Sequence, residues 1–259
     1  MPETLKIAEP APGLVVVTFS RPEAFNALST LMGRELLEVW AGLAARADLR
    51  AVVLAGEGKH FCAGADLKER NGMTDQAWAD QHKLFEDMIR AQLAVPVPVI
   101  AAVQGAAMGG GSEQALACDF IYAADNARFG LPEVGLGIMP GLGGTQNLPR
   151  AVGTRRALEL LTTGLPFSAA KALDYGLVNA VYAPDDLMPK ALETAGVIAT
   201  KAPLSVRALK KVVRRGVNME LPAAMDFEVE LYNDLFRTAD RREGVGAFNE
   251  KRQAVFKGR

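Results

Sequence analysis

The feature that most constrains the fold is a glycine-rich turn between a buried strand and a helix. Residues 97–103, Val-Pro-Val-Ile-Ala-Ala-Val, are apolar and β-prone, which predicts a buried strand. Glycines 109–111 follow, and residues 112–118 have the composition of a short helix. At such a turn the first N–H groups of the helix lack intrahelical partners and lie at the positive end of its dipole. Because glycine lets a ligand approach the backbone closely, this turn suits a negatively charged oxygen.

A second stretch has the same design. Residues 50–55 predict a strand, and residues 61–69, Phe-Cys-Ala-Gly-Ala-Asp-Leu-Lys-Glu, place a small-residue turn at the start of a helix-prone segment. Two adjacent strand–turn–helix units could aim two N–H groups at one point, which is the geometry of an oxyanion hole. Tight packing at strand-to-helix corners would also explain these turns, so both interpretations stay open on this evidence.

Two glutamates lie in apolar, glycine-rich sequence rather than on a charged face. Glu113 directly follows the first turn, and Glu133 lies within residues 129–140, Phe-Gly-Leu-Pro-Glu-Val-Gly-Leu-Gly-Ile-Met-Pro. A carboxylate buried alone is costly, so such a residue is paired, protonated or functional. Two that lie close together repel when both are ionised, which separates their pKa values and provides one acid and one base. For each glutamate taken singly, capping a backbone or pairing with an arginine is the structural alternative.

Together these motifs resemble the enoyl-CoA hydratase (crotonase) family. The likeness rests on residues 61–69, on Gly-Gly-Gly-Ser-Glu at 109–113, on Pro-Glu at 132–133 and on Pro-Gly-Leu-Gly-Gly-Thr-Gln at 140–146. It extends from Arg21 to Arg252, and several motifs in order and at the right spacing are more specific than any one of them. The resemblance implies an α/β fold: a ClpP-like crotonase spiral of ββα units over residues 1–200, followed by a helical trimerisation region over residues 201–259.

The resemblance also implies an activity, the syn addition of water across the C2=C3 double bond of a trans-2-enoyl-CoA. Glu113 and Glu133 match the two catalytic glutamates of the family, and the backbone N–H groups of Ala65 and Gly110 match its oxyanion hole. Glu113 is expected to activate the water and Glu133 to deliver a proton to C2, although a concerted sharing of both roles is equally compatible. Because both glutamates are present, hydration is favoured over double-bond isomerisation.

Further implications of the resemblance concern ligands and assembly. The remaining positions implied to bind the substrate or coenzyme A are Ala24, Ala63, Asp66, Leu67, Lys68, Phe248 and Lys251. The last two match residues that reach the ligand of a neighbouring subunit in a homotrimer or in a hexamer made of two trimers. No metal is expected, and the only coenzyme is the coenzyme A of the substrate itself.

Alternative functions stay open. Residues 64–70 and 241–248 resemble the methylglutaconyl-CoA hydratase branch, so a branched or functionalised acyl-CoA is a second substrate class, and that branch includes an RNA-binding member. Four basic residues at helical spacing form a stripe on one face of a predicted helix: Arg207, Lys210, Lys211 and Arg214. This stripe would be a solvated face, a contact to the phosphates of coenzyme A or an RNA contact. A net charge of −1 and the lack of an RNA motif argue against RNA. Trp78, in an amphipathic segment over residues 76–93, belongs either to the core or to a wall of the acyl pocket.

Composition sets the remaining expectations. A chain of 259 residues, 49% of them hydrophobic, can bury a large core. Cys62 and Cys118 show neither a disulfide framework nor metal-ligand spacing, and the only histidines, His60 and His82, are expected to be ordinary loop or helix-surface residues. No signal peptide or membrane-spanning apolar run is visible, so a soluble, cytoplasmic protein is expected.

Overall fold

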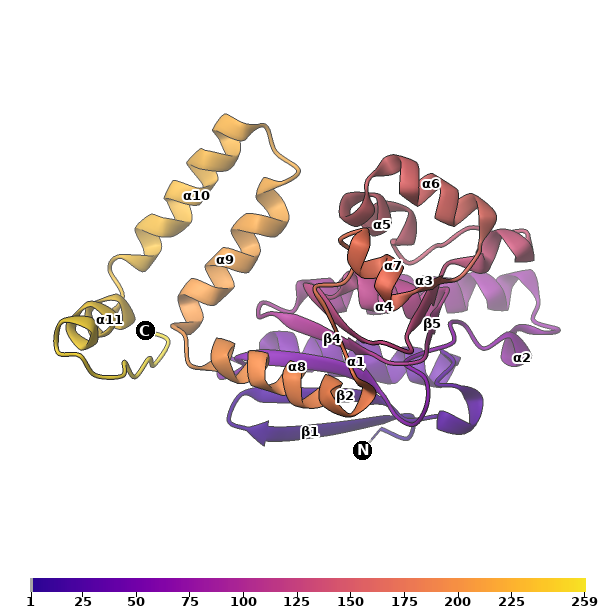
Figure 1. The fold of residues 1–259 in the computed structure, drawn as a ribbon, viewed down its shortest axis with the longest axis horizontal. Coiled ribbons are helices and arrows are strands. Elements are labelled where there is room, and N and C mark those ends of the chain that lie inside the picture. The colour runs from indigo at the N-terminus through magenta and orange to yellow at the C-terminus, as the bar shows by residue number, and fades with distance from the viewer. Residues whose placement is uncertain (1) are drawn as a thin grey trace.

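The computed structural model describes residues 2–259 as two β-sheets enclosed by helices (Figure 1). The large sheet has the strand order β1-β2-β3-β4-β6-β9 and the small sheet the order β5-β7-β8. The large sheet consists of β1 (Leu5–Ala11), β2 (Leu14–Phe19), β3 (Ala51–Gly56), β4 (Val99–Val103), β6 (Phe120–Ala124) and β9 (Ala180–Tyr182). The small sheet consists of β5 (Ala106–Met108), β7 (Arg128–Gly130) and β8 (Phe167–Ser168). Only the β1–β2 hairpin interrupts the parallel pairing of the large sheet.

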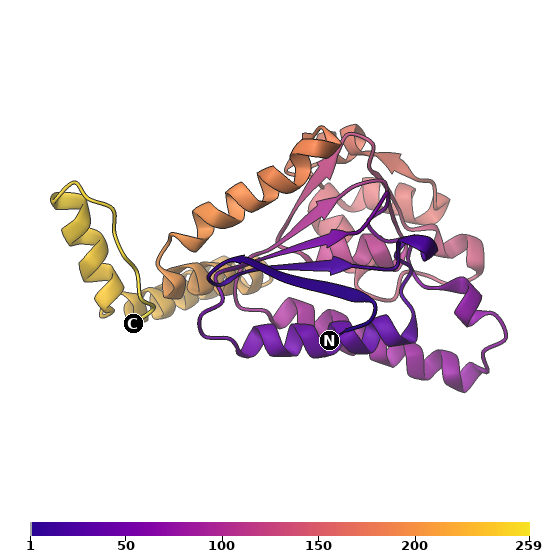
Figure 2. The ribbon, with the colours of Figure 1, turned by 90° about the horizontal axis from the view of Figure 1, so that it is seen from below.

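Helices cover both faces of the large sheet, as its apolar parallel strands require. Alternate residues of β3 point to opposite faces, so that Val52 and Leu54 join one hydrophobic cluster while Ala51 and Val53 join the other. On the first face lie α1 (Thr30–Ala45) and α3 (Asp75–Ala94), and on the second lies α8 (Pro184–Ala199) (Figure 2). The amphipathic segment over residues 76–93 lies within α3, as its pattern predicts.

The predicted ββα units are present as three successive turns of the chain. In the second turn, β4 leads to β5 and then to α4 (Gly110–Ala117); in the third, β6 leads to β7 and then to the 3₁₀ helix η2 (Pro132–Leu136). The first turn runs from β3 to α2 (Leu67–Arg70), and its short strand is reduced to one bridge between Cys62 and Ala107. Each turn therefore delivers a helix N-terminus to the same side of the small sheet.

Local differences from the expected elements have physical causes. The last strand of the large sheet, β9, starts only at Ala180, because the N–H groups of Gly176 and Leu177 still bond back to α7 (Ala169–Asp174). The short strand β5 was not predicted from the sequence. The chain between the third unit and α7 forms α5 (Gly144–Val152) and α6 (Thr154–Thr163).

The last three helices project from the body of the molecule (Figure 1). They are α9 (Pro203–Gly216), α10 (Leu221–Leu235) and α11 (Ala239–Asn249), and Pro203 and Pro222 lie in the first turns of α9 and α10, where a missing N–H costs nothing. Large apolar side chains of these helices face solvent in the single chain; they include Val213, Leu221, Met225, Tyr232 and Phe248. Among the helices formed by residues 2–259, none is both long and apolar enough to cross a bilayer.

The basic stripe on α9 is not a solvated face, because three of its four cations are engaged within the chain, and this corrects that interpretation of the sequence. Arg207 donates to the carbonyl oxygens of residues 46, 47 and 49. Lys210 and Arg214 form salt bridges with Asp119, at 2.7 and 2.8 Å. Lys211 is exposed and lies over the ring of Phe227. Three of the four cations therefore attach α9 to the sheet, because they neutralise Asp119 and satisfy carbonyl groups at strand and helix ends.

Replacing Asp119 with alanine is expected to lower the free energy of unfolding by about 3 kcal/mol, because a buried cation loses its counter-ion. The Lys210 side chain is only 8% exposed, and Asp119 also accepts the N–H of Val99. Urea denaturation measures the change without screening the ion pairs. The exposed pair between Lys83 and Asp87 provides the control, and Asp87→Ala should cost less than about 1 kcal/mol. Equal costs for the two variants would contradict this account of α9.

Candidate active site

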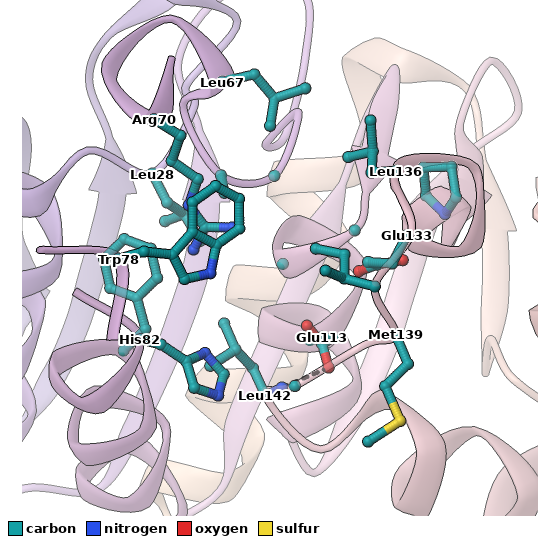
Figure 3. Close-up of a pocket in the computed structure, with 18 of the residues that line it drawn as sticks. Leu28, Leu67, Arg70, Trp78, His82, Glu113, Glu133, Leu136, Met139 and Leu142 are labelled. Atoms are coloured by element: carbon teal, nitrogen blue, oxygen red, sulfur yellow. Dashed lines mark hydrogen bonds between the residues drawn. The ribbon is translucent and has the colours of Figure 1, made fainter. Parts of the chain in front are cut away.

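The starts of α2, α4 and η2 surround a cavity of about 560 Å³ (Figure 3). One wall comes from α2 and α3, and the other from η2 and residues 136–142. Glycines and apolar side chains form most of the lining. Within residues 2–259 its only ionisable side chains are Arg70, His82, Glu113 and Glu133. The described residues contain no group of three or more His, Cys, Asp or Glu side chains placed to hold a metal ion.

Two backbone N–H groups meet in this cavity. Leu28 pairs with the chain on either side of Ala65, donating to Gly64 O and accepting from Asp66 N, so the Ala65 N–H points away from Leu28. Gly110 is the first residue of α4, where an N–H has no intrahelical acceptor. Within residues 2–259 neither N–H donates to a protein acceptor. A Cβ built on Gly110 would lie 3.8 Å from the Ala65 nitrogen, so the two donors are close.

Glycine at position 64 is what allows the two turns to approach each other. Its φ of +92° is unfavourable for other residues, and a Cβ there would lie 2.7 Å from Met108 O and 3.4 Å from Gly110 N. The tight-packing interpretation of this turn is therefore correct, and it coexists with the convergence of the two N–H groups.

Glu113 is held in one orientation by the glycine turn before α5. Its Oε1 accepts the N–H of Leu142 at 2.7 Å and the N–H of Gly144 at 2.8 Å. The residue is 2% exposed. Burial raises the pKa of Glu113 to about 7; the two N–H donors oppose this shift, and the nearby charge of Glu133 adds to it. Glu113 thus has the backbone-capping contacts of a structural carboxylate while it lines the cavity.

Glu133 differs from Glu113 in its surroundings. It lies in the first turn of η2 and is 8% exposed, and its buried Oε2 has no hydrogen-bond partner within residues 2–259. Burial raises the pKa of Glu133 above the usual value for a glutamate. No arginine pairs with either glutamate among the described residues, so this structural alternative is excluded for that part of the chain. Glu113 comes from α4 and Glu133 from η2, and both carboxyl groups lie on the side of the cavity across from Trp78 (Figure 3).

The structure brings only part of the predicted binding set to the cavity. Ala63 and Leu67 line it together with Ala65 and Gly110. Asp66 instead caps α2 by accepting the N–H groups of residues 68 and 69, and it forms a salt bridge with Arg21 at 3.0 Å. Its carboxylate is therefore engaged within the protein.

The other predicted binding residues lie outside the cavity lining in this chain. Ala24 ends the 3₁₀ helix η1 (Pro22–Ala24), and Lys68 is exposed on α2. Phe248, 83% exposed on α11, and Lys251 just beyond it lie at the opposite end of the molecule from α2 (Figures 1 and 2). Both are therefore remote from the cavity of their own subunit.

Sequence reasoning missed two side chains in the cavity and left a third undecided. Trp78 lines the cavity, which favours the acyl-wall interpretation. His82, expected on a helix surface, lines it as well, beside Gly141. Together with Phe85 they lie at i, i+4 and i+7 of α3, and this spacing on one helical face was the available signal. Arg70, at the end of α2, was included only as part of residues 64–70 and was not identified as a cavity residue.

Comparisons with known proteins agree with this architecture. The sequence model of the enoyl-CoA hydratase/isomerase family matches residues 9–259. A short-chain-enoyl-CoA hydratase of Clostridium acetobutylicum is 42% identical over 93% of this chain and 92% of the relative. A crotonyl-CoA hydratase of Syntrophomonas wolfei is 42% identical over 96% of each chain. The crystal structure of an enoyl-CoA hydratase from Bacillus anthracis superposes with a TM-score of 0.97 and 40% identity, covering 99% of this chain and 100% of that one.

These matches define the class of protein. The chain belongs to the enoyl-CoA hydratase/isomerase family and has the crotonase fold. The predicted family, fold and class of enzyme are thereby confirmed, since the relatives named above are hydro-lyases by name.

Proposed function

We propose that this protein is an enoyl-CoA hydratase that adds water syn across the C2=C3 double bond of a trans-2-enoyl-CoA. The observation that carries the proposal is one apolar cavity that contains two buried glutamates and two unpaired backbone N–H groups. The names of the relatives, a short-chain-enoyl-CoA hydratase and a crotonyl-CoA hydratase, support the same reaction.

The N–H groups of Ala65 and Gly110 would bind the thioester oxygen. Attack of water at C3 moves the π electrons of the double bond toward this oxygen, and the resulting enolate-like species needs fixed donors. Both N–H groups lack acceptors in the described part of the chain and lie close together, as an oxyanion hole requires. Each such donor contributes about 10²- to 10³-fold in rate in acyl-transfer enzymes.

The two glutamates would divide the proton transfers. Two N–H donors favour the ionised form of Glu113, so it would accept the proton of the attacking water while the O–C3 bond forms. Glu133, whose buried Oε2 has no hydrogen-bond partner within residues 2–259, would deliver a proton to C2. Because both carboxyl groups lie on one side of the cavity, oxygen and hydrogen would arrive on the same face of the double bond (Figure 3).

The same proposal includes the rest of the ligand and the assembly. The exposed apolar side chains of α9 to α11 would be covered by neighbouring subunits in a trimer or a pair of trimers. Phe248 and Lys251 would then reach a neighbour's coenzyme A, which their distance from their own cavity permits. The reaction consumes only water and the thioester, so it needs no separate cofactor.

Hydration of crotonyl-CoA, followed by the loss of the conjugated enoyl-thioester absorbance, tests the function. Turnover with the 3-hydroxyacyl-CoA as product would support it. A protein that moves the double bond of a 3-enoyl-CoA but does not hydrate 2-enoyl thioesters would refute it.

The value of kcat/KM for this hydration is expected to rise with pH through an apparent pKa of about 7, because Glu113 acts as the base only when it is ionised.

The free energy of unfolding should instead fall as the pH rises. The pKa of the folded state lies above the value of 4.5 for an unperturbed glutamate, so the native state binds more protons between these pH values and the free energy of unfolding falls as pH rises through them. Glu113→Gln should reduce this fall in urea denaturation. An unchanged stability profile in that variant would assign the titration to another group.

A further inference from the structure

Among residues 2–259, one cation in the cavity has no counter-ion. Arg70, the last residue of α2, is half-buried in the wall opposite the two glutamates, and its guanidinium lies 4.3 Å from the centre of the Trp78 ring (Figure 3). It is the only lysine or arginine in the lining among residues 2–259. Within the same residues it forms no salt bridge with a carboxylate.

A buried hydrogen-bond network holds this guanidinium in place. Its Nε donates to Oε1 of Gln81 at 2.7 Å, and Gln81 is 3% exposed. The amide nitrogen of Gln81 donates in turn to Thr30 Oγ1 at 2.8 Å and to Glu69 Oε2 at 3.3 Å. Glu69, the acidic residue next to Arg70, is thus engaged by Gln81 and by the N–H of Thr30 rather than by the guanidinium.

The terminal nitrogens of Arg70 are consequently free. Within residues 2–259 the side chain donates no hydrogen bond other than the one from Nε. A guanidinium that is fixed through Nε and stacked on an aromatic ring presents its remaining N–H groups as a planar fork, the geometry that binds a carboxylate through two parallel bonds.

Burial makes the unpaired charge costly. It lowers the pKa of Arg70, yet an arginine stays protonated in proteins and therefore needs a counter-charge instead. Stacking on Trp78 offsets only part of the cost. A purely hydrocarbon acyl chain would cover the guanidinium without replacing its lost water, whereas an acyl chain that ends in an anion would pair with it.

We propose that Arg70 binds a carboxylate at the distal end of the acyl group, so that the preferred substrate is a 2-enoyl-CoA carrying a terminal carboxylate. The inference rests on the proposed function, because the acyl group must enter the cavity that holds Glu113 and Glu133. Among the functionalised acyl-CoA substrates that residues 64–70 leave open, it specifies one chemical class, which the two glutamates and the oxyanion hole do not.

Two matched thioesters test the proposal. Glutaconyl-CoA carries the terminal carboxylate, and 5-methyl-2-hexenoyl-CoA replaces the two carboxylate oxygens with methyl groups. The wild-type protein should favour glutaconyl-CoA by at least about 10-fold in kcat/KM. Arg70→Met should lower kcat/KM for glutaconyl-CoA by about 10- to 100-fold, the range for a lost charge-assisted hydrogen bond, and change it less than about 3-fold for the neutral thioester.

The control is Lys83→Met, which removes an exposed cation of α3 that pairs with Asp87 outside the cavity, and it should leave both values unchanged. An equal loss with both substrates in Arg70→Met would mean that Arg70 acts on coenzyme A or on the shape of the pocket, and would overturn the proposal. A wild-type preference for the neutral thioester would overturn it as well.

Binding of saturated analogues separates this proposal from the hydratase function. Calorimetry with glutaryl-CoA and 5-methylhexanoyl-CoA requires no turnover, and Arg70→Met should weaken only the binding of glutaryl-CoA, by about 10-fold or more. If neither unsaturated substrate is hydrated, the proposed function fails, while the ratio of the two dissociation constants still decides the carboxylate site. Equal binding of the analogues by the wild-type protein would refute that site even in an active hydratase.

Discussion

Glu133→Gln is expected to lower kcat for hydration of a 2-enoyl-CoA by about 10²- to 10⁴-fold, the usual contribution of a positioned general acid. Glutamine keeps the shape of the side chain in its buried position but has no proton acidic enough to transfer to carbon. The thioester should still bind, since the N–H groups of Ala65 and Gly110 are unchanged, so its dissociation constant should shift by only a few-fold. Single-turnover and binding measurements separate the two quantities. Glu193→Gln, an exposed change on α8, is the control.

The same variants decide which glutamate serves which carbon. Exchange of the C2 protons of butyryl-CoA with deuterated water needs a base at C2 and no water attack at C3. If Glu133 acts at C2, Glu133→Gln abolishes the exchange and Glu113→Gln retains most of it. The opposite result would reverse the assignment. The kcat of the double variant should be only slightly lower than the kcat of the more impaired single variant, because the effects of residues that act as a unit are not additive.

The turns around the cavity could be predicted because short, local stretches of sequence determine them. A strand, a small-residue turn and a helix start are encoded within about twenty residues, and the first N–H of α4 is a free donor because of its position alone. The direction of the Ala65 N–H also depends on pairing with the distant Leu28. That Glu113 and Glu133 share a cavity follows from the repetition of the ββα unit, which places successive helix starts side by side. The family resemblance supplied this repetition, and the sequence spacing alone did not.

Contacts between distant segments could not be predicted in the same way. The stripe on α9 had the spacing of a solvated face, and only the position of Asp119 at the start of β6 turns it into a buried attachment. Arg70 likewise belongs to a four-residue helix with no periodic pattern, and Gln81, which orients it, is eleven residues further along the chain. For His82 the helical spacing with Trp78 was visible, but the direction of that face depended on how α3 packs.

Gly111→Ala is expected to lower the free energy of unfolding by about 2 to 4 kcal/mol, because the position is overpacked. A Cβ at Gly111 would lie 2.1 Å from the carbonyl oxygen of Cys62 and 2.9 Å from its Cβ. That carbonyl oxygen accepts the N–H of Met108 in the bridge between the first two ββα units. A methyl group therefore cannot be accommodated unless α4 moves away from this bridge, and α4 carries both Gly110 and Glu113.

Displacement of α4 should reduce catalysis as well as stability, by about 10²-fold in kcat/KM, since a misplacement near 1 Å costs about this much. The matched control is Gly196→Ala in α8, where no atom lies within 4 Å of the added Cβ. There the same substitution should raise the free energy of unfolding by about 0.5 to 1 kcal/mol, through the higher helix propensity of alanine, and leave kcat/KM unchanged. Both glycines have ordinary backbone angles, so the comparison isolates space as the cause. If Gly111→Ala were as stable and active as Gly196→Ala, the close contact between the two ββα units could not be what positions the oxyanion hole and Glu113 together.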